Sequence, residues 1–148
     1  MKVVFLDVDG VLSKFGTKGN GPLGLSKPLM RNLSFLVKSS KAKIVLSSSW
    51  RMYPENRFKL ARTLRYKGLK ISSSTPVIDG GDQRTRQQEI EQWLKEHPEV
   101  TDYVILDDIP DYFSKPLADH LVVCDPEVGL TEDKAAEALE ILGALEDE

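Results

Sequence analysis

The stretch Val3-Val4-Phe5-Leu6-Asp7-Val8-Asp9-Gly10-Val11-Leu12 joins an apolar run to two carboxylates, and it decides the fold. No polar alternation interrupts the run, which is typical of a strand buried on both faces of a parallel sheet. On an extended chain, the i, i+2 spacing points Asp7 and Asp9 the same way, and Gly10 allows a tight turn beside them. Like charges this close favour a bound cation or a protonated carboxyl. The alternative is a strand that merely ends in a polar turn.

The composition is that of an ordinary globular protein. With 148 residues, 41% hydrophobic and 29% charged, the chain fits a single domain over 1–148. A single cysteine, Cys124, excludes a disulfide framework and suits a reducing cytoplasm, and its apolar neighbours predict a buried strand residue. We find no signal peptide and no membrane-spanning run, so we expect a cytoplasmic protein without a membrane partner.

Charge is unevenly distributed along the chain. The net charge of −3 argues against a generic nucleic-acid binder, yet residues 51–70 hold seven basic side chains and one acid. Residues 125–148 hold nine acids and one lysine, and the acidic end, about 144–148, is expected to be disordered. The basic segment is either a solvated helix face or a track for a polyanion, and the sequence leaves this open.

Strand and helix patterns alternate along the chain. The predicted strands are 2–6, 43–46, either 69–72 or 76–78, 103–106 and 121–123. The predicted helices cover about 26–39, 54–67 and 85–97, with a last helix capped by Thr131. Residues of about 13–25 are rich in glycine and predict a mobile flap. This order predicts an α/β Rossmann-like three-layer sandwich around a parallel sheet of about five strands.

Three predicted strands end in polar side chains. Asp7 and Asp9 follow the first, residues 47–49 are serines after the second, and Asp107 and Asp108 follow the fourth. The carboxyl edge of an open parallel sheet is where ligands bind, so these groups should meet there. Several carboxylates in one place require a hard cation, and Mg²⁺ with carboxylate, water and phosphate ligands is the usual solution.

These strand ends and their order in the chain resemble the four sequence motifs of the haloacid dehalogenase (HAD) superfamily of phosphohydrolases. The first motif matches residues 5–12 and the second matches residues 44–48. The third motif, a basic residue that opens a later helix, is best matched by Arg86, with Arg84 as the alternative. The fourth matches residues 105–108, followed by Asp111. The resemblance implies a HAD-like fold and a phosphoric monoester hydrolase.

The resemblance also implies roles for the acidic residues. Asp7 would be the nucleophile that forms an aspartyl-phosphate, and Asp9 would be the general acid and base. Mg²⁺ would bind Asp7, the backbone carbonyl of Asp9, and Asp107. Asp108 or Asp111 would hold waters or the basic residue.

Phosphate binding is assigned to one serine and one arginine. Ser48 would donate to the phosphoryl oxygens, with Ser47 as the alternative if the motif is displaced by one residue. Arg86 would neutralise the nucleophile and the phosphate, where the family more often has lysine. Without such roles, Ser48 would be a plain helix cap and Arg86 an exposed residue at a helix start.

The segments that could carry a substrate-selecting cap domain, 10–48 and 51–86, are too short for one. A capless site is open, which favours a large substrate, such as a nucleic-acid end or a phosphoprotein, or a partner that closes the site. The Ser-Ser-Trp-Arg of residues 48–51 and the segment 125–131 also resemble the HAD domain of Swiss Army Knife RNA-repair proteins.

Trp50 and Arg51 are expected at the rim of the site, where they could stack on a base and hold a flanking phosphate. Alternatively, Trp50 packs on the sheet edge and Arg51 pairs with an acid. His97 and His120 match no motif and are interpreted as structural.

The leading hypothesis is a magnesium-dependent phosphatase. Its substrate would be a nucleotide or a polynucleotide phosphate end, as in nucleic acid repair, with a small metabolite phosphate as the alternative. A non-catalytic, regulatory domain that uses the same Mg²⁺ and phosphate pocket to recognise a phosphorylated partner is the second hypothesis. The oligomeric state stays open.

Overall fold

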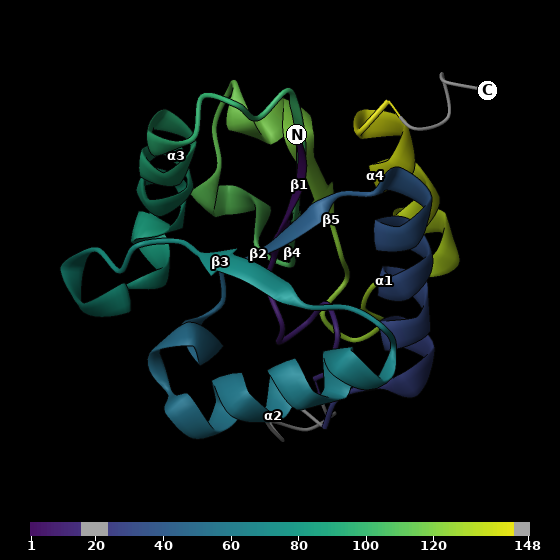
Figure 1. Cartoon of the computed structure of the whole chain (residues 1–148). Coiled ribbons are helices and arrows are strands. Elements are labelled where there is room, and N and C mark those ends of the chain that lie inside the picture. The colour runs from purple at the N-terminus through teal and green to yellow at the C-terminus, as the bar shows by residue number, and fades with distance from the viewer. Residues whose placement is uncertain (16–23, 144–148) are drawn as a thin grey trace.

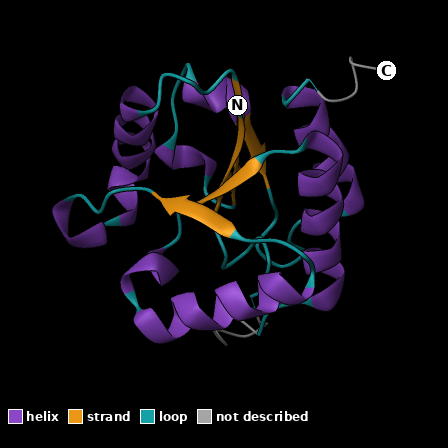
Figure 2. Cartoon of the chain, in the orientation of Figure 1, coloured by secondary structure: helices purple, strands orange, loops and turns teal. Residues whose placement is uncertain are grey.

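A central sheet of five parallel strands organises the computed structural model, which describes residues 1–15 and 24–143 (Figures 1 and 2). The strand order is β3-β2-β1-β4-β5, so the first strand lies in the middle. The strands are β1 (Lys2–Leu6), β2 (Lys43–Leu46), β3 (Ile71–Ser74), β4 (Asp102–Asp107) and β5 (Leu121–Val123). The predicted parallel α/β sheet is confirmed, and β3 overlaps the first of the two alternatives for the third strand.

The register of the sheet brings three chain segments to one level. Leu6 lies opposite Leu46 on one side and Leu106 on the other. The next residues continue this alignment, because Asp7 N donates to Leu106 O (3.1 Å) and Ser47 N donates to Leu6 O (2.8 Å). From β1 the chain moves first toward β2 and β3 and later toward β4 and β5, so the end of β1 is a topological switch point.

Helices cover both faces of the sheet and complete the predicted three-layer sandwich (Figure 1). On one face, α1 (Lys27–Ser40), α2 (Pro54–Tyr66) and α4 (Glu132–Ile141) pack against the side of β1 that carries Val4 and Leu6. On the other face, α3 (Arg86–Glu96) packs against Val3 and Phe5, with Ile90 and Trp93 buried between them. Successive residues of β1 thus alternate between two cores, which explains its uninterrupted apolar run.

Helix starts follow the predicted signals. Thr131 caps α4, since its Oγ1 accepts a hydrogen bond from Lys134 N at 3.3 Å. Ser26 precedes α1, which has Pro28 in its first turn.

Within the described residues, α1 is the only helix between Gly10 and Ser48, and no folded insertion of cap-domain size interrupts the sheet. The predicted flap (13–25) falls largely on residues 16–23, which lie outside the described residues, as does the predicted acidic end, 144–148. In residues 1–15 and 24–143, no helix has the length and hydrophobicity that crossing a bilayer requires.

Candidate functional site

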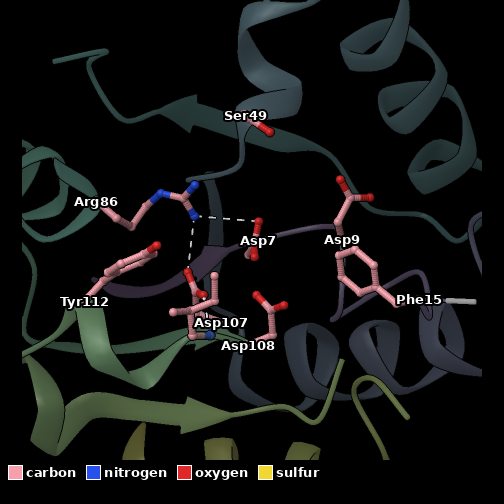
Figure 3. A pocket seen from close by; sticks show the side chains of 9 residues that line it. Asp7, Asp9, Phe15, Ser49, Arg86, Asp107, Asp108 and Tyr112 are labelled. Carbon is pink, nitrogen blue, oxygen red and sulfur yellow. Dashed lines mark hydrogen bonds and ion pairs between the residues drawn. The ribbon is translucent and has the colours of Figure 1, made fainter. Parts of the chain in front are cut away.

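A cavity of about 240 Å³ opens at the carboxyl edge of the sheet, where β1 and β4 end (Figure 3). Its position is that expected for a ligand site at a topological switch point. The residues that line it are Asp7, Asp9, Phe15, Ser49, Arg86, Asp107, Asp108, Ile109 and Tyr112.

Three carboxylates gather at one side of this cavity. Oxygen atoms of Asp7, Asp107 and Asp108 lie within 4.8 Å of one another. Gly10 permits this approach, because a Cβ at position 10 would lie 2.5 Å from Asp108 Oδ2. Gly10 also has φ +87°, a conformation that L side chains rarely adopt. Asp108, which we expected to hold waters or the basic residue around the metal, thus belongs to the carboxylate cluster itself.

Burial disfavours the charged forms of Asp7 and Asp107. Burial raises the pKa of Asp7 well above its ordinary value, and the nearby Asp107 raises it further. Burial also raises the pKa of Asp107 to about 6. A divalent cation would offset this repulsion, and three clustered carboxylates are the hard oxygen ligands that Mg²⁺ takes. The residues present therefore fit a magnesium ion.

Arg86 supplies positive charge next to the cluster (Figure 3). Its Nη1 lies 3.2 Å from Asp107 Oδ2 and 3.6 Å from Asp7 Oδ1, and the residue is only 4% exposed. The alternative, Arg84, is exposed and pairs with Asp82 at 2.7 Å instead. Of the two candidates, the structure brings only Arg86 to the pocket. Arg86 reaches the pocket because it is the first residue of α3, and α3 starts beside the end of β4.

Arg51 does not lie at the rim, and this corrects the prediction. Its side chain is buried, its Nη2 lies 2.6 Å from Glu89 Oε2, and its Nη1 donates to Ser48 O at 2.7 Å. Its Nε also donates to Thr75 O at 3.2 Å, so one guanidinium joins the ends of β2 and β3. The alternative interpretation, pairing with an acid, is confirmed. Buried in this way, Arg51 is not available to a flanking phosphate.

Glu89 is a functional candidate that the sequence did not reveal. It is 1% exposed and lies between two arginines, 2.6 Å from Arg51 Nη2 and 3.8 Å from Arg86 Nε. Its Oε2 also accepts a hydrogen bond from Ile78 N at 2.9 Å. The only available signal was the i, i+3 spacing of Arg86 and Glu89 on one helix.

The three serines after β2 have different environments. Ser48 Oγ accepts a hydrogen bond from Trp50 N at 3.1 Å, which makes Ser48 the cap of a short 3₁₀ turn. Ser47 Oγ is buried without a hydrogen-bond partner, and Ser49 lines the cavity. Because side chains alternate along a strand, Ser47 lies on the same side of the sheet as Asp7. Of the three serines, Ser49 alone lines the cavity, and Ser47 lies behind it with a hydroxyl that is free of hydrogen bonds to the described residues.

Asp9 lies across the cavity from Arg86, on the other side of Asp7 (Figure 3). Its carboxylate accepts hydrogen bonds from Trp50 Nε1 and from Ser13 Oγ, both at 3.1 Å. Trp50 is half-buried against the larger core, which agrees with packing at the sheet edge, and its indole N–H also orients Asp9.

Asp111 is exposed and does not line the cavity, so its predicted place around the metal is not what the structure shows. Asp111 belongs instead to a short 3₁₀ turn whose next residue, Tyr112, does line the cavity. The sequence did not reveal Phe15 and Tyr112 as site residues. They flank the carboxylates from opposite sides (Figure 3). Neither sits in a pattern that distinguishes it from a core aromatic residue.

Three other polar or reactive side chains lie outside the cavity. The His97 ring stacks on Trp93 (3.7 Å between centroids), and the His120 ring stacks on Tyr103 (3.9 Å). Cys124 is fully buried, as predicted, but it directly follows β5 instead of lying in a strand, and burial raises its pKa to about 12. None of the three can act as a nucleophile or base at the carboxylate cluster.

Comparison with known families places the chain in a described family. The model of the HAD domain in Swiss Army Knife RNA repair proteins matches residues 3–135, from β1 into α4. A search of curated proteins found no match. The matched range includes every residue that lines the cavity.

Proposed function

Because the chain belongs to the HAD domain family of Swiss Army Knife RNA repair proteins, we propose that it is a Mg²⁺-dependent phosphatase acting on a phosphomonoester. The observation that carries the proposal is the grouping of Asp7, Asp107 and Asp108 with a buried arginine at the sheet's switch point. Three carboxylates without a cation would repel a phosphate. An arginine that only bound phosphate would not need three carboxylates beside it. Together they suit a phosphate shared between a metal ion and a guanidinium.

The proposed reaction proceeds through Asp7. A carboxylate oxygen of Asp7 attacks phosphorus while the ester P–O bond breaks, and Asp9 gives its proton to the leaving oxygen. Water then attacks the aspartyl-phosphate, Asp9 takes the proton, and phosphate leaves with Asp7 restored. Asp7, Asp107 and the backbone carbonyl of Asp9 would hold Mg²⁺, with Asp108 beside them, and the ion would supply electrostatic stabilisation to the phosphoryl oxygens.

Arg86 and the serine segment would bind the phosphoryl group. Arg86 already lies against Asp7, so its guanidinium can hold a phosphoryl oxygen next to the attacking carboxylate. For the serine, the unpartnered hydroxyl of Ser47 supports Ser47 over Ser48, whose hydroxyl already accepts Trp50 N. Substituting each serine with alanine separates the two: the phosphate ligand is the one whose loss raises KM.

For the substrate, we propose a nucleotide or a polynucleotide phosphate end. The RNA repair proteins in which this domain family occurs support it, and so do the aromatic rings of Phe15 and Tyr112 beside the carboxylates. A small metabolite phosphate is the alternative substrate.

One observation favours the alternative of a non-catalytic domain that binds a phosphorylated partner. Both oxygens of Asp9 already have hydrogen-bond partners within the protein, Trp50 Nε1 and Ser13 Oγ, so the fold engages the side chain that would have to transfer protons.

The decisive experiment measures hydrolysis of p-nitrophenyl phosphate with Mg²⁺. We expect turnover that EDTA abolishes and that Asp7→Asn lowers by at least about 10³-fold, since the nucleophile is lost. Asp111→Asn, the same change outside the cavity, is the matched control and should keep wild-type activity. No turnover of this ester or of phosphorylated oligonucleotides would reject the enzyme in favour of the binding domain.

A further inference from the structure

Four exposed side chains form a stripe on α2, which we name the α2 face: Phe58, Arg62, Arg65 and Tyr66. Their spacing of i, i+4, i+7 and i+8 places them on one side of the helix, while Leu60 and Leu64 are buried in the core. Phe58 is 66% exposed and Tyr66 is 85% exposed. Large aromatic rings this exposed contribute little to the fold.

Within residues 1–15 and 24–143, the charges of the α2 face have no ion-pair partner. Among the residues that the structure describes, no acid forms an ion pair with Arg62 or Arg65. The surrounding segment, 51–70, has a single acid, Glu55, against seven basic residues. By contrast, the two buried arginines, Arg51 and Arg86, each have a carboxylate partner. The α2 face is therefore a patch of uncompensated positive charge.

Cations interleaved with exposed aromatic rings are the combination that binds single-stranded nucleic acid. Guanidinium groups contact phosphates, and rings stack on bases of any sequence. Arg62, Arg65 and Tyr66 also line a common hollow in the surface, so a phosphate and a base could be held next to each other there.

The helix that carries the α2 face follows the cavity-lining Ser49 closely in the chain. Ser49 lines the cavity, and α2, at the bottom of Figure 1, begins at Pro54 after one 3₁₀ turn. With a rise of 1.5 Å per residue, Arg62 lies about 12 Å along the helix from Pro54. A substrate that contacted both the cavity and Arg62 would have to extend along α2, as an oligonucleotide would and a free mononucleotide would not.

We infer that the α2 face binds the backbone and bases of a single-stranded polynucleotide whose terminal phosphate occupies the cavity. The inference rests on the proposed phosphatase function and adds a substrate class: a polynucleotide end rather than a free nucleotide or a metabolite. Charge complementarity and base stacking select this occupant over an acidic protein, which would have no use for Phe58 and Tyr66 as stacking platforms.

The test compares two double charge reversals, Arg62→Glu with Arg65→Glu on α2, and Arg31→Glu with Lys38→Glu at exposed positions of α1. Substrates are p-nitrophenyl phosphate and single-stranded 12-mers phosphorylated at the 3′ or the 5′ end. We expect the α2 variant to lose at least about tenfold in kcat/KM on one 12-mer while its rate on the small ester changes less than twofold. The α1 variant, with the same change in net charge, should lose much less on the 12-mer.

Salt dependence and stacking provide independent readouts. Loss of two phosphate contacts should reduce the slope of log KM against log salt by about 1.4, from about 0.7 per contact on a single strand. Phe58→Ser with Tyr66→Ser should weaken 12-mer binding without changing that slope.

The result is separable from the proposed function, because binding of the 12-mer to Asp7→Asn can be followed by fluorescence anisotropy without turnover. The inference fails if the α2 and α1 variants lose equally, if the α2 variant keeps wild-type affinity, or if an acidic peptide competes better than the 12-mer. If wild-type protein binds the 12-mer through α2 but hydrolyses no phosphoester, only the proposed function fails.

Discussion

The cavity and the α2 face both concentrate charged side chains, but the two regions differ in whether these charges are buried and paired. At the cavity and directly behind it, five charged side chains are buried, and each lies within ion-pair distance of a group of opposite sign: Asp7, Asp107, Glu89, Arg51 and Arg86. On the α2 face, Arg62 and Arg65 are exposed and have no such partner among the described residues. A buried charge requires a partner inside the protein. An exposed one does not, so Arg62 and Arg65 are available to an external polyanion, which is the role that we propose for them.

The strongest way to break this comparison is to remove the acid between the two arginines. Glu89→Gln should lower the free energy of unfolding by about 3–5 kcal/mol, because it leaves the buried Arg51 without its carboxylate. Urea denaturation measures the change, and Glu91→Gln, an exposed position on the same helix, is the control. A loss no larger than that of the control would mean that Arg51 does not depend on Glu89.

A smaller effect is expected from metal binding to the carboxylate cluster. At about 100 times its dissociation constant, Mg²⁺ should stabilise the wild-type protein by about 2.7 kcal/mol, seen as a rise in Tm. Asp107→Asn should abolish most of this rise and Asp111→Asn should not, because only Asp107 belongs to the cluster. An equal rise in both variants would place the bound ion elsewhere.

The smallest effect on stability is expected from the α2 face. Arg62→Ser with Arg65→Ser should change the free energy of unfolding by no more than about 0.5 kcal/mol, since exposed side chains without partners add little to the fold. The same urea titration measures it. Destabilisation above about 1 kcal/mol would show that these arginines support the structure, and it would remove the contrast with the cavity.

The fold followed from local patterns that strong physical constraints produce. A strand buried on both faces, such as Lys2–Leu6, must be apolar throughout, and a helix such as α4 needs a cap like Thr131. The third strand was ambiguous because Ile71–Ser74 contains three serines and lies at the edge of the sheet, where half of its side chains are exposed. Edge strands carry a weak signal for this reason.

The site was harder to predict because its contacts join distant segments. Nothing local showed that Arg51 would turn inward to Glu89, thirty-eight positions along the chain, or that Trp50 would reach Asp9. Asp108 and Asp111 look alike in sequence, yet a 3₁₀ turn leaves Asp111 exposed while Gly10 admits Asp108 to the cluster. The roles assigned to Asp7, Asp9, Ser48 and Arg86 stay predictions until they are measured.

The hydrogen bond from the Trp50 indole to Asp9 also gives the protein a built-in optical signal. The chain has two tryptophans, and the other, Trp93, is buried against Phe5 and His97 on the opposite face of the sheet. In a Trp93→Phe background, the remaining indole emission would come from a chromophore that directly contacts Asp9, the proposed general acid. Its wavelength and intensity would show, in real time and without any label, when a bound phosphoester draws that carboxylate away from the indole.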